Sequence, residues 1–296
     1  MSNRILGWKY YNHAAIPTTA PHEEPDLTSI KDGSIWHIEG KKPLLARYTT
    51  NWDCGYDTGW WYVIKDTPFD ISALKTKRRY EITKAMRFFD VKEIKTSSFI
   101  DDLCEIQEKA WAVYPAKYRP VFDKQAFVKM LAQWDDQINQ GSLKIFGAFF
   151  KENGKLCGYT NVVCREKYFS LAIQKAIPDF EKYSLNAALL NGILDSLNDK
   201  LAQGYYVSDG ARSIVHETHF QDYLEKYFGF RKAYCRLNLA YPSLYRTIIS
   251  FLYPIRRVVE IFGLRIGLFH QISGILKMEE IVRKCKKTQM DSAHKH

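Results

Sequence analysis

The stretch LKIFGAFFKENGKLCGYTNVVC, residues 143–164, constrains the fold more than any other part of the sequence. Two apolar runs flank Asn153-Gly154, a dipeptide that favours the positive φ angles of a two-residue type I′ turn. The pattern therefore predicts an antiparallel β-hairpin. An isolated hairpin is only marginally stable in water, so further strands or helices must pack against its apolar side chains.

The segments before the hairpin predict one strand and two helices. VKEI forms the short strand, and Ser98 opens the first helix with Asp101 three residues on, as in a capping box. In the second helix, apolar residues recur at helical spacing from Phe127 to Ile138, and Gly141 ends it.

The segments after the hairpin alternate between strands and helices. YFSLAIQKAI is a strand, an amphipathic helix then ends at Gly204, and YYVSDG is another strand. Residues Thr218 to Gln221 match a capping box for a helix that ends at Gly229, and RKAYCRLNLAY closes the series as an alternating strand. This order predicts an α/β (α+β) fold with a mixed, mostly antiparallel sheet flanked by helices.

The sequence divides into three parts around this region. Residues 1–90 form an aromatic-rich N-terminal subdomain, in which SIWHIEGKKPLLARYTT predicts two short strands around a Gly-Lys-Lys turn and ISALKTKRRYEITKAMRFF predicts a basic helix. Residues 91–241 form the domain just described. Residues 242–296 form a helical C-terminal extension that is both basic and apolar.

The net charge of +10 favours anionic partners such as phosphates, nucleic acid or a membrane surface, although a solvated basic surface would carry the same charge. No apolar segment near the start resembles a signal peptide, and none reaches the roughly 18 residues that span a bilayer. The six cysteines form no CxxC pair. We therefore expect a cytoplasmic protein with reduced thiols.

The segment IPDFEKYSLNAALLNGIL, residues 177–194, connects a predicted strand to a predicted helix. Loops in this position hold ligand phosphates in several enzymes, because the N–H groups and the positive dipole end of the helix face the anion. Lys182, Ser184, Leu185 and Asn186 are therefore candidates for donor binding. The turn has no glycine, and a plain strand–helix connection capped by Ser184 is the alternative.

Together with LEKYFGF, this segment resembles the GNAT acyltransferases (the acyl-CoA N-acyltransferase fold), in which such a loop and helix hold the pyrophosphate of coenzyme A. With the basic KTKRRYEITKA upstream, the chain resembles Fem-type peptidoglycan-bridge aminoacyltransferases and bacterial relatives near surface-polysaccharide genes. The resemblance covers roughly residues 70–241. It implies acyl-CoA as co-substrate, with aminoacyl-tRNA as the less favoured alternative, and no tightly bound cofactor.

The resemblance leaves the catalytic residues open. Many GNAT enzymes have a general-acid tyrosine four residues before the glycine of the late Gly-Phe pair, and that register gives Glu225 here. His216 and Asp209 are candidates for a base that takes the proton of an amine nucleophile. His216 and His219 have a spacing that could ligate a metal, but no third ligand is evident, so no metal is expected.

An aromatic cluster upstream is a candidate for acceptor binding. Trp52, Asp53, Trp60 and Trp61 could stack on a sugar and bind its hydroxyls, or the aromatic residues could form the core of the N-terminal subdomain.

Cationic side chains are the second group of acceptor candidates. Their charges suit phosphates on the acceptor, and a solvated helix face is the alternative. The residues are Lys77, Arg78, Arg79 and Arg212.

The C-terminal extension carries an apolar stripe beside basic residues. After Tyr241, ten lysines and arginines stand against four acids, which is more than half of the chain's net charge. The apolar residues near one helical face are Ile248, Ile249, Leu252, Ile255, Val259 and Phe262. The pattern suits peripheral contact with anionic lipid on the inner membrane face. Packing on the domain or on a second subunit is the alternative.

These features predict an acyl- or aminoacyltransferase. It would move an acyl group from acyl-CoA, or from aminoacyl-tRNA, to an amine of a cell-envelope sugar or peptide precursor, which is a small-molecule or lipid-linked anionic acceptor. The alternative is a non-catalytic GNAT-fold module that binds an anionic partner or a membrane surface.

Overall fold

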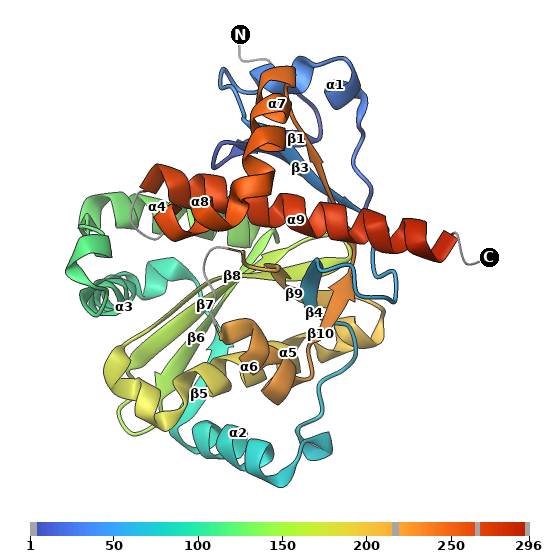
Figure 1. Ribbon diagram of the computed structural model, residues 1–296. Helices are drawn as coiled ribbons and strands as arrows, with labels where there is room; N and C mark the ends of the chain where they lie inside the picture. Colours follow the sequence, from blue (N-terminus) through green and yellow to red (C-terminus); the bar gives the residue numbers. More distant parts are fainter. Residues whose placement is uncertain (1–4, 215–218, 264–266, 294–296) are drawn as a thin grey trace. The chain divides into compact units, whose positions relative to one another are not determined.

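The computed structural model describes residues 5–214, 219–263 and 267–293 (Figure 1). The chain forms two compact units, each built from separate stretches of sequence. Unit 1 comprises residues 1–62, 211–218 and 232–296, and unit 2 comprises residues 63–210 and 219–231. The three consecutive parts expected from the sequence are thus divided differently, because the first and last stretches of the chain belong to one unit.

A seven-stranded mixed sheet runs through unit 2. Strands β5 to β8 are antiparallel neighbours, β8 and β9 are parallel, and the chain passes between the units within β4, β9 and β10. The expected mixed, mostly antiparallel sheet is confirmed. In sheet order the strands are β10 (Arg231–Tyr234), β4 (Trp61–Lys65), β9 (Tyr206–Ala211), β8 (Tyr168–Ala176), β7 (Leu156–Cys164), β6 (Leu143–Phe150) and β5 (Phe89–Glu93).

Helices of unit 2 follow the order predicted from the sequence. Two helices lie between β5 and β6, one follows β8, and one follows β9. The α-helices are α2 (Thr76–Phe88), α3 (Ile100–Ala112), α4 (Lys124–Asn139), α5 (Leu185–Ala202) and α6 (Phe220–Phe228). The 3-10 turns are η2 (Ile71–Ala73), η3 (Thr96–Ser98), η4 (Ala116–Tyr118) and η5 (Pro178–Tyr183).

Helices α5 and α3 cover opposite faces of the sheet. Successive side chains of a strand point to opposite faces, and Gly158 and Tyr159 are successive on β7. A Cβ at Gly158 would lie 2.7 Å from Cδ2 of Leu185 on α5. The Tyr159 hydroxyl, in contrast, donates to Oε1 of Gln107 on α3 at 2.9 Å. Unit 2 is therefore a three-layer arrangement with the core on both faces of the sheet (Figure 1).

The hairpin of β6 and β7 confirms the first expectation, but its turn is not of type I′. Gly154 has a φ of 72°, whereas Asn153 does not have a positive φ. The backbone N–H of Gly154 donates to the Phe150 carbonyl at 2.8 Å, and the N–H of Phe150 donates to Lys155 at 2.8 Å. The loop therefore has four residues between this last pair, and a single left-handed glycine is enough to close it.

The predicted capping box at the start of α3 is wrong. Helix α3 begins at Ile100 and has no side-chain cap. Instead, the carboxylate of Asp135 on α4 accepts from the N–H groups of Thr96 and Ser97 at 2.7 and 2.9 Å, in the preceding turn. A carboxylate distant in sequence has taken the place of the local cap.

Unit 1 contains a four-stranded sheet in the order β1 (Trp8–Tyr11), β2 (Ala14–Pro17), β3 (Leu45–Thr50) and β11 (Arg236–Ala240). β2 and β3 are parallel, whereas the other two pairs are antiparallel. The two strands expected in SIWHIEGKKPLLARYTT are therefore one strand, β3, because Ser34–His37 forms a 3-10 turn, η1. RKAYCRLNLAY, expected as one strand, is divided between β10 and β11, which belong to different sheets.

The expected helical C-terminal extension is confirmed. The helices of unit 1 are α1 (Thr28–Lys31), α7 (Ser243–Leu252), α8 (Arg256–Gly263) and α9 (Gly267–Ala293), with a 3-10 turn, η6 (Tyr253–Ile255), between α7 and α8. In the ranges that the structure describes, no helix is both long and apolar enough to cross a membrane.

All six cysteines are free, as expected from the sequence. Four of them are buried in the two units. Burial raises the pKa of the Cys157 thiol to about 11 and that of Cys235 to about 12. Because the thiolate is the nucleophile, these thiols are core residues without nucleophilic character at neutral pH.

Candidate functional site

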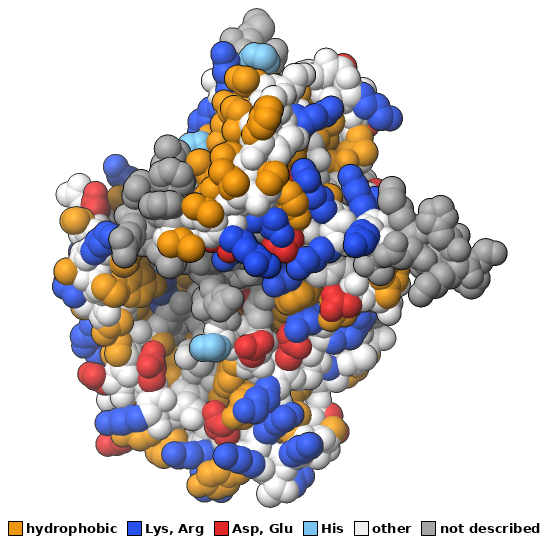
Figure 2. Space-filling view, in the orientation of Figure 1, with side chains coloured by type: hydrophobic (Ala, Val, Ile, Leu, Met, Phe, Trp, Pro, Cys, Tyr) orange, Lys and Arg blue, Asp and Glu red, His pale blue; other side chains and the backbone are white. Residues whose placement is uncertain are grey.

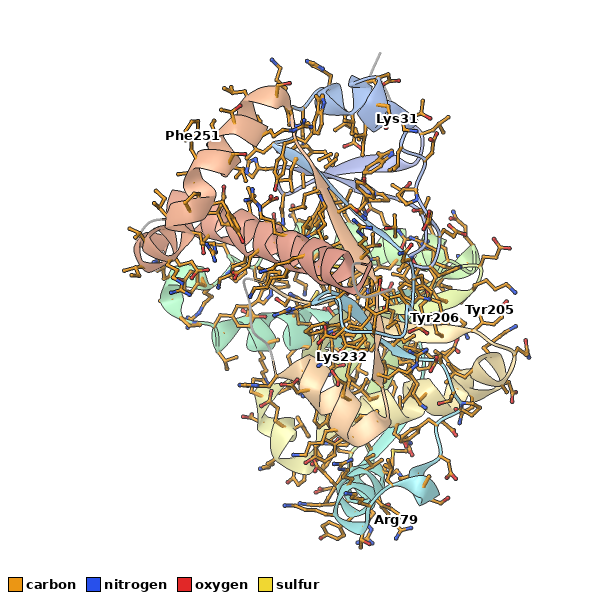
Figure 3. The ribbon with its side chains drawn as sticks, turned by 45° about the vertical axis from the view of Figure 1, so that its right-hand side comes forward. Lys31, Arg79, Tyr205, Tyr206, Lys232 and Phe251 are labelled. Atoms are coloured by element: carbon orange, nitrogen blue, oxygen red, sulfur yellow. The ribbon has the colours of Figure 1, made fainter. Side chains whose placement is uncertain are left out.

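Strands β8 and β9 lie side by side only at their start. Their parallel register begins at Tyr168–Tyr206 and ends at Ser170–Ser208, although β8 continues to Ala176. Figure 3 labels Tyr206 at the paired end. Beyond this point β8 keeps its pairing with β7, and in the described chain no register with β9 continues. The backbone N–H and C=O groups on that edge of β8 are therefore available to an extended ligand.

A β-bulge accompanies the separation of the two strands. Asn161 on β7 pairs with Ile173 on β8, but the next residue, Val162, pairs with Leu171, so Ala172 is an extra residue on β8. A bulge bends its strand and increases the local twist. It therefore helps to turn β8 away from β9, two residues after their pairing ends.

The loop between β8 and α5 adopts a left-handed conformation without a glycine. Ser184 has φ 60° and ψ 42°, the αL region that glycine usually occupies. Its side chain makes no cap hydrogen bond, while its carbonyl accepts from Ala187 at 2.9 Å and from Ala188 at 3.2 Å. The alternative of a plain connection capped by the Ser184 side chain is therefore not what the structure shows. The loop keeps the backbone geometry of a glycine-containing turn, and its serine hydroxyl is not used to close the helix.

A cleft of about 330 Å³ lies beside this loop, within unit 2. Asn186 lines it, and the Asn186 Oδ1 atom accepts from Gln174 of β8 at 2.8 Å. The remaining lining residues come from the end of β8, from η5 and from the ends of α3 and α6. These are Ala110, Val113, Tyr114, Lys175, Ala176, Pro178, Glu181 and Phe220.

Two of the donor candidates differ from the expectation in what they can contribute. Leu185 is fully buried, so its side chain belongs to the core and only its backbone N–H remains for a ligand. Lys182 is exposed on η5, with its Nζ 5.1 Å from the centre of the Tyr183 ring. The first turn of any α-helix has N–H groups without an intrahelical acceptor. The loop thus combines helix N–H donors with the positive charge of Lys182.

Asp209 lies on β9, one residue beyond the last pairing with β8. Burial raises the pKa of Asp209 to about 6, and a hydrogen bond with the Gln221 side chain on α6 opposes part of this rise. At neutral pH the carboxyl is mostly ionised, and it accepts a proton more readily than an ordinary aspartate. Of the three catalytic candidates, Asp209 has the environment of a general base.

The other catalytic candidates differ from Asp209. Glu225 is partly buried on α6. His216 lies outside the described residues. His219 is exposed beside Asp222, with its Nδ1 3.8 Å from a carboxylate oxygen. Within the residues described, no three His, Cys, Asp or Glu side chains form a group that could hold a metal ion.

Tyr223 is a residue of α6 that the family register did not select. Burial raises its pKa well above the usual range, with further contributions from Glu81 and Tyr227. Such a phenol stays protonated at neutral pH, and its hydroxyl can both donate and accept a hydrogen bond. It stacks against Phe220, a residue that lines the cleft, at 6.3 Å between ring centres.

The basic residues of α2 belong to unit 2 as well. Lys77 and Arg79 are exposed, and Figure 3 shows Arg79 at the surface on α2. One guanidinium nitrogen of Arg79 donates to the Ser72 carbonyl at 3.3 Å. The Arg78 guanidinium lies 5.9 Å from the centre of the Tyr227 ring of α6. The cluster therefore has two exposed cations and one that packs on an aromatic ring.

The tryptophans expected to stack on a sugar are held by unit 1 itself. Trp60 is 2% exposed in a cluster with Cys235 and Leu237, so its predicted stacking role is wrong. Trp61 is partly exposed, but Arg212 and Lys232 each lie 4.5 Å from its ring centre (Lys232 is labelled in Figure 3). Cations already occupy the positions over that ring.

Arg212 is likewise held by unit 1. One of its guanidinium nitrogens donates to the Gly59 carbonyl at 2.6 Å, and its backbone N–H donates to Trp61 at 2.8 Å. Trp52 packs on Tyr62 with ring centres 5.4 Å apart, and Asp53 takes a positive φ of 49°. These residues are better explained as structural parts of unit 1 than as a sugar platform.

Unit 1 also contains a cationic cleft that sequence reasoning missed. It has a volume of about 740 Å³, and both Arg47 and Arg212 line it. Burial lowers the pKa of Arg47, and its guanidinium donates to the Met278 sulfur at 3.9 Å. Nothing in the sequence around Arg47 indicates a binding site. The residue lines this cleft because the fold brings β3 beside Met278 of α9.

The chain matches solved structures at low sequence identity. One match is to the C-terminal domain of a proposed lysylphosphatidylglycerol synthetase from Agrobacterium fabrum. The match covers 82% of this chain and 82% of the other, at 11% identity and a TM-score of 0.49. Against L-PGS from Bacillus licheniformis, 84% of this chain and 85% of the other match, at 16% identity and a TM-score of 0.45.

A third match is shorter. It is to the PaiA N-acetyltransferase from Thermoplasma acidophilum in complex with coenzyme A, over 38% of this chain and 73% of the other, at 14% identity and a TM-score of 0.30. No family model and no curated protein matches the sequence. The element order from β5 to α6 is the one predicted, and the mixed, mostly antiparallel sheet flanked by helices is confirmed. The Fem-type relationship stays a prediction.

Proposed function

We propose that the protein transfers an acyl or aminoacyl group to an amine of a cell-envelope sugar or peptide precursor. The observation that carries this proposal is the separation of β8 from β9 beside the left-handed loop at Ser184. An extended donor needs backbone partners along its length, which the open edge of β8 offers. Its phosphates need N–H donors and positive charge, which the start of α5 and Lys182 offer.

Acyl-CoA is the donor that this arrangement favours. Its pantetheine arm is a linear chain with amide groups, so it can pair with a strand edge as a peptide does. The pyrophosphate at the end of the arm matches the loop between β8 and α5. Aminoacyl-tRNA remains the less favoured donor, because the cleft of about 330 Å³ suits a narrow chain better than a broad nucleic acid surface.

The proposed reaction is an aminolysis. The amine nitrogen attacks the thioester carbonyl carbon, the new C–N bond forms, the C–S bond breaks and the thiolate leaves. The proton of the amine passes to the carboxylate of Asp209, whose raised pKa suits a base at neutral pH. The thiolate is a good leaving group, so holding the two reactants in line supplies much of the rate.

The acceptor proposal rests on the basic residues of α2. The exposed cations of α2, Lys77 and Arg79, suit phosphates of a small-molecule or lipid-linked precursor. This proposal places the protein on the cytoplasmic side, where activated donors and envelope precursors are made.

Isothermal titration calorimetry with coenzyme A tests the donor site. Lys182→Ala should weaken binding by about fivefold to tenfold, because one charge at a phosphate is lost. Lys200→Ala is the matched control, since Lys200 lies in the last turn of α5, at the end opposite the loop, and should have no effect. Pantetheine, which lacks the nucleotide and its phosphates, should bind at least tenfold more weakly than coenzyme A.

Transfer itself is measured with acetyl-CoA and a panel of amino sugars and peptides, by release of free thiol. Asp209→Asn should reduce kcat by about 10²-fold or more, with a smaller effect on coenzyme A affinity. Binding of coenzyme A without any transfer would favour the non-catalytic module. Failure of both acyl-CoA and aminoacyl-tRNA to bind at millimolar concentration would refute the donor site.

A further inference from the structure

Six large apolar side chains form an exposed stripe along α7, η6 and α8 in unit 1. Their spacing of three or four residues keeps them on one side of the helices. Phe251 is 77% exposed, Leu244 67% and Ile261 65%, and Figure 3 shows Phe251 directed away from α7. The members of the stripe are Leu244, Ile248, Phe251, Ile255, Val258 and Ile261.

This exposed stripe is not the one that the sequence pattern identified. Ile249 and Val259, which the pattern placed on the lipid face, are buried in a cluster with Leu276 of α9. Leu252 packs against the same cluster. The helices therefore have two apolar faces, one that packs on α9 and one that is left exposed. The face with Ile249 and Val259 is covered by packing within unit 1. The face with Phe251 has no partner among the described residues.

The charges beside the exposed stripe are mainly positive. Between Ser243 and Ile261 the sequence has three arginines and one acid, Glu260. Arg246 and Arg257 are exposed, and among the described residues neither has an ion-pair partner. Arg256 differs, because it lies 3.6 Å from Glu280. Figure 2 shows apolar side chains along α7 and α8 with basic side chains next to them.

We propose that the exposed stripe of α7 and α8 docks on an anionic lipid surface, with Phe251 and its neighbours in the headgroup–acyl boundary and Arg246 and Arg257 at the phosphates. An apolar face bordered by cations is the surface that interfacial helices use. A second copy of the same stripe would bring together two segments that each carry three arginines against one acid, Glu260, so the net positive charge favours anionic lipid over self-association. The proposal stands independently of the transferase proposal.

Docking on an anionic membrane should make binding depend on the arginines beside the stripe. Anionic membranes attract juxtamembrane arginines, and this attraction is lost at high salt, whereas the contribution of apolar burial is not. Binding should therefore require anionic lipid and weaken with salt. At low salt each arginine should contribute about fivefold in affinity, which corresponds to about 1 kcal/mol.

Flotation of the full-length protein with vesicles tests the proposal. The vesicles contain equal parts of phosphatidylglycerol and phosphatidylcholine, and phosphatidylcholine alone serves as the neutral comparison. We expect the protein to float with the anionic vesicles only. The double variant Phe251→Ser, Ile255→Ser should reduce binding at least tenfold, because two of the exposed anchors are lost. The double variant Tyr118→Ser, Val121→Ser is the matched control, since both side chains are exposed and apolar but lie in unit 2.

A second pair of variants isolates the charge. Arg246→Gln with Arg257→Gln should weaken binding to anionic vesicles roughly 25-fold at low salt, whereas Lys117→Gln with Lys129→Gln should not. Circular dichroism confirms that each variant is folded, which is expected because all these side chains are exposed.

Three results would overturn the proposal. One is the absence of flotation by the wild-type protein at low salt, and another is equal binding by the stripe variant and its control. The third is a dimer by sedimentation that the stripe variant converts to a monomer without any vesicle binding, because a second copy would then occupy the stripe.

Discussion

Replacement of Asp209 by asparagine should stabilise the protein at alkaline pH and leave it almost unchanged in acid. Burial raises the pKa of this carboxyl from the ordinary 3.8 to about 6. The folded chain therefore holds a proton that the unfolded chain has already lost between these two pH values. Stability consequently falls as the pH rises from about 4 to about 6, and it stays lower above that range.

The size of the effect follows from the two pKa values. At about 1.4 kcal/mol per pH unit, the difference corresponds to about 3 kcal/mol, an upper limit because the carboxyl keeps some contact with solvent. Asparagine has nearly the same shape and its amide can still bond to Gln221, but it has no charge to bury. At pH 8 the variant should therefore exceed the wild-type free energy of unfolding by up to about 3 kcal/mol.

Urea denaturation of both proteins at pH 4, 6 and 8 measures this difference. The stabilisation by Asp209→Asn should fall below about 1 kcal/mol at pH 4, because the folded carboxyl is then protonated. Asp195→Asn is the control, since Asp195 is an exposed carboxyl on α5 of the same unit. The same stability change at pH 4 and pH 8, or a destabilisation at pH 8, would refute burial as the cause of the raised pKa.

Three further outcomes follow from the packing of unit 2. Gly192→Ala should lower the free energy of unfolding, measured in urea, by about 1–3 kcal/mol. The added Cβ would lie 2.5 Å from Cγ1 of Val91. If Val91→Ala in the same chain does not restore any of the lost stability, the steric explanation is wrong. Ser184→Gly should raise the free energy of unfolding by about 0.5–1 kcal/mol, since it removes αL strain at a residue without a cap bond, and a loss of stability would show that the hydroxyl is used. Cys157 should resist iodoacetamide in the native protein at pH 7 while the urea-unfolded chain reacts, because burial raises its pKa to about 11; equal labelling rates would contradict this.

The sequence predicted elements whose cause is local. The hairpin of β6 and β7 forms because two apolar runs flank a glycine turn, and α6 ends at Gly229 in the αL conformation as expected. Helix α4 was recognised by apolar residues at helical spacing, and its Phe127, Leu131 and Trp134 are indeed buried. In each case the information lies within a few residues, so no knowledge of the rest of the chain is needed.

The candidate site was predictable only in part. The position of the loop between β8 and α5 could be read from the order of elements, and Asp209 was recognised as a titratable group in a strand. Its raised pKa was not readable, because it arises from burial and from Gln221 on another element. The sugar-stacking role of Trp60 and Trp61 could not be judged from the sequence for a related reason. Composition identifies an aromatic cluster, but only packing shows that Trp60 is in the core and that cations lie over Trp61.

The amino-acid sequence by itself determined the order of strands and helices from β5 to α6 and that the fold is a mixed α/β one, because periodicity and turn residues act locally. The tertiary structure alone decided which face of each element is covered. In α7 and α8 both faces are apolar, so the pattern could not distinguish Ile249, which packs near α9, from Phe251, which is exposed. The structure likewise decided that β8 and β9 separate after Ser170, because strand pairing depends on contacts between residues far apart in the chain.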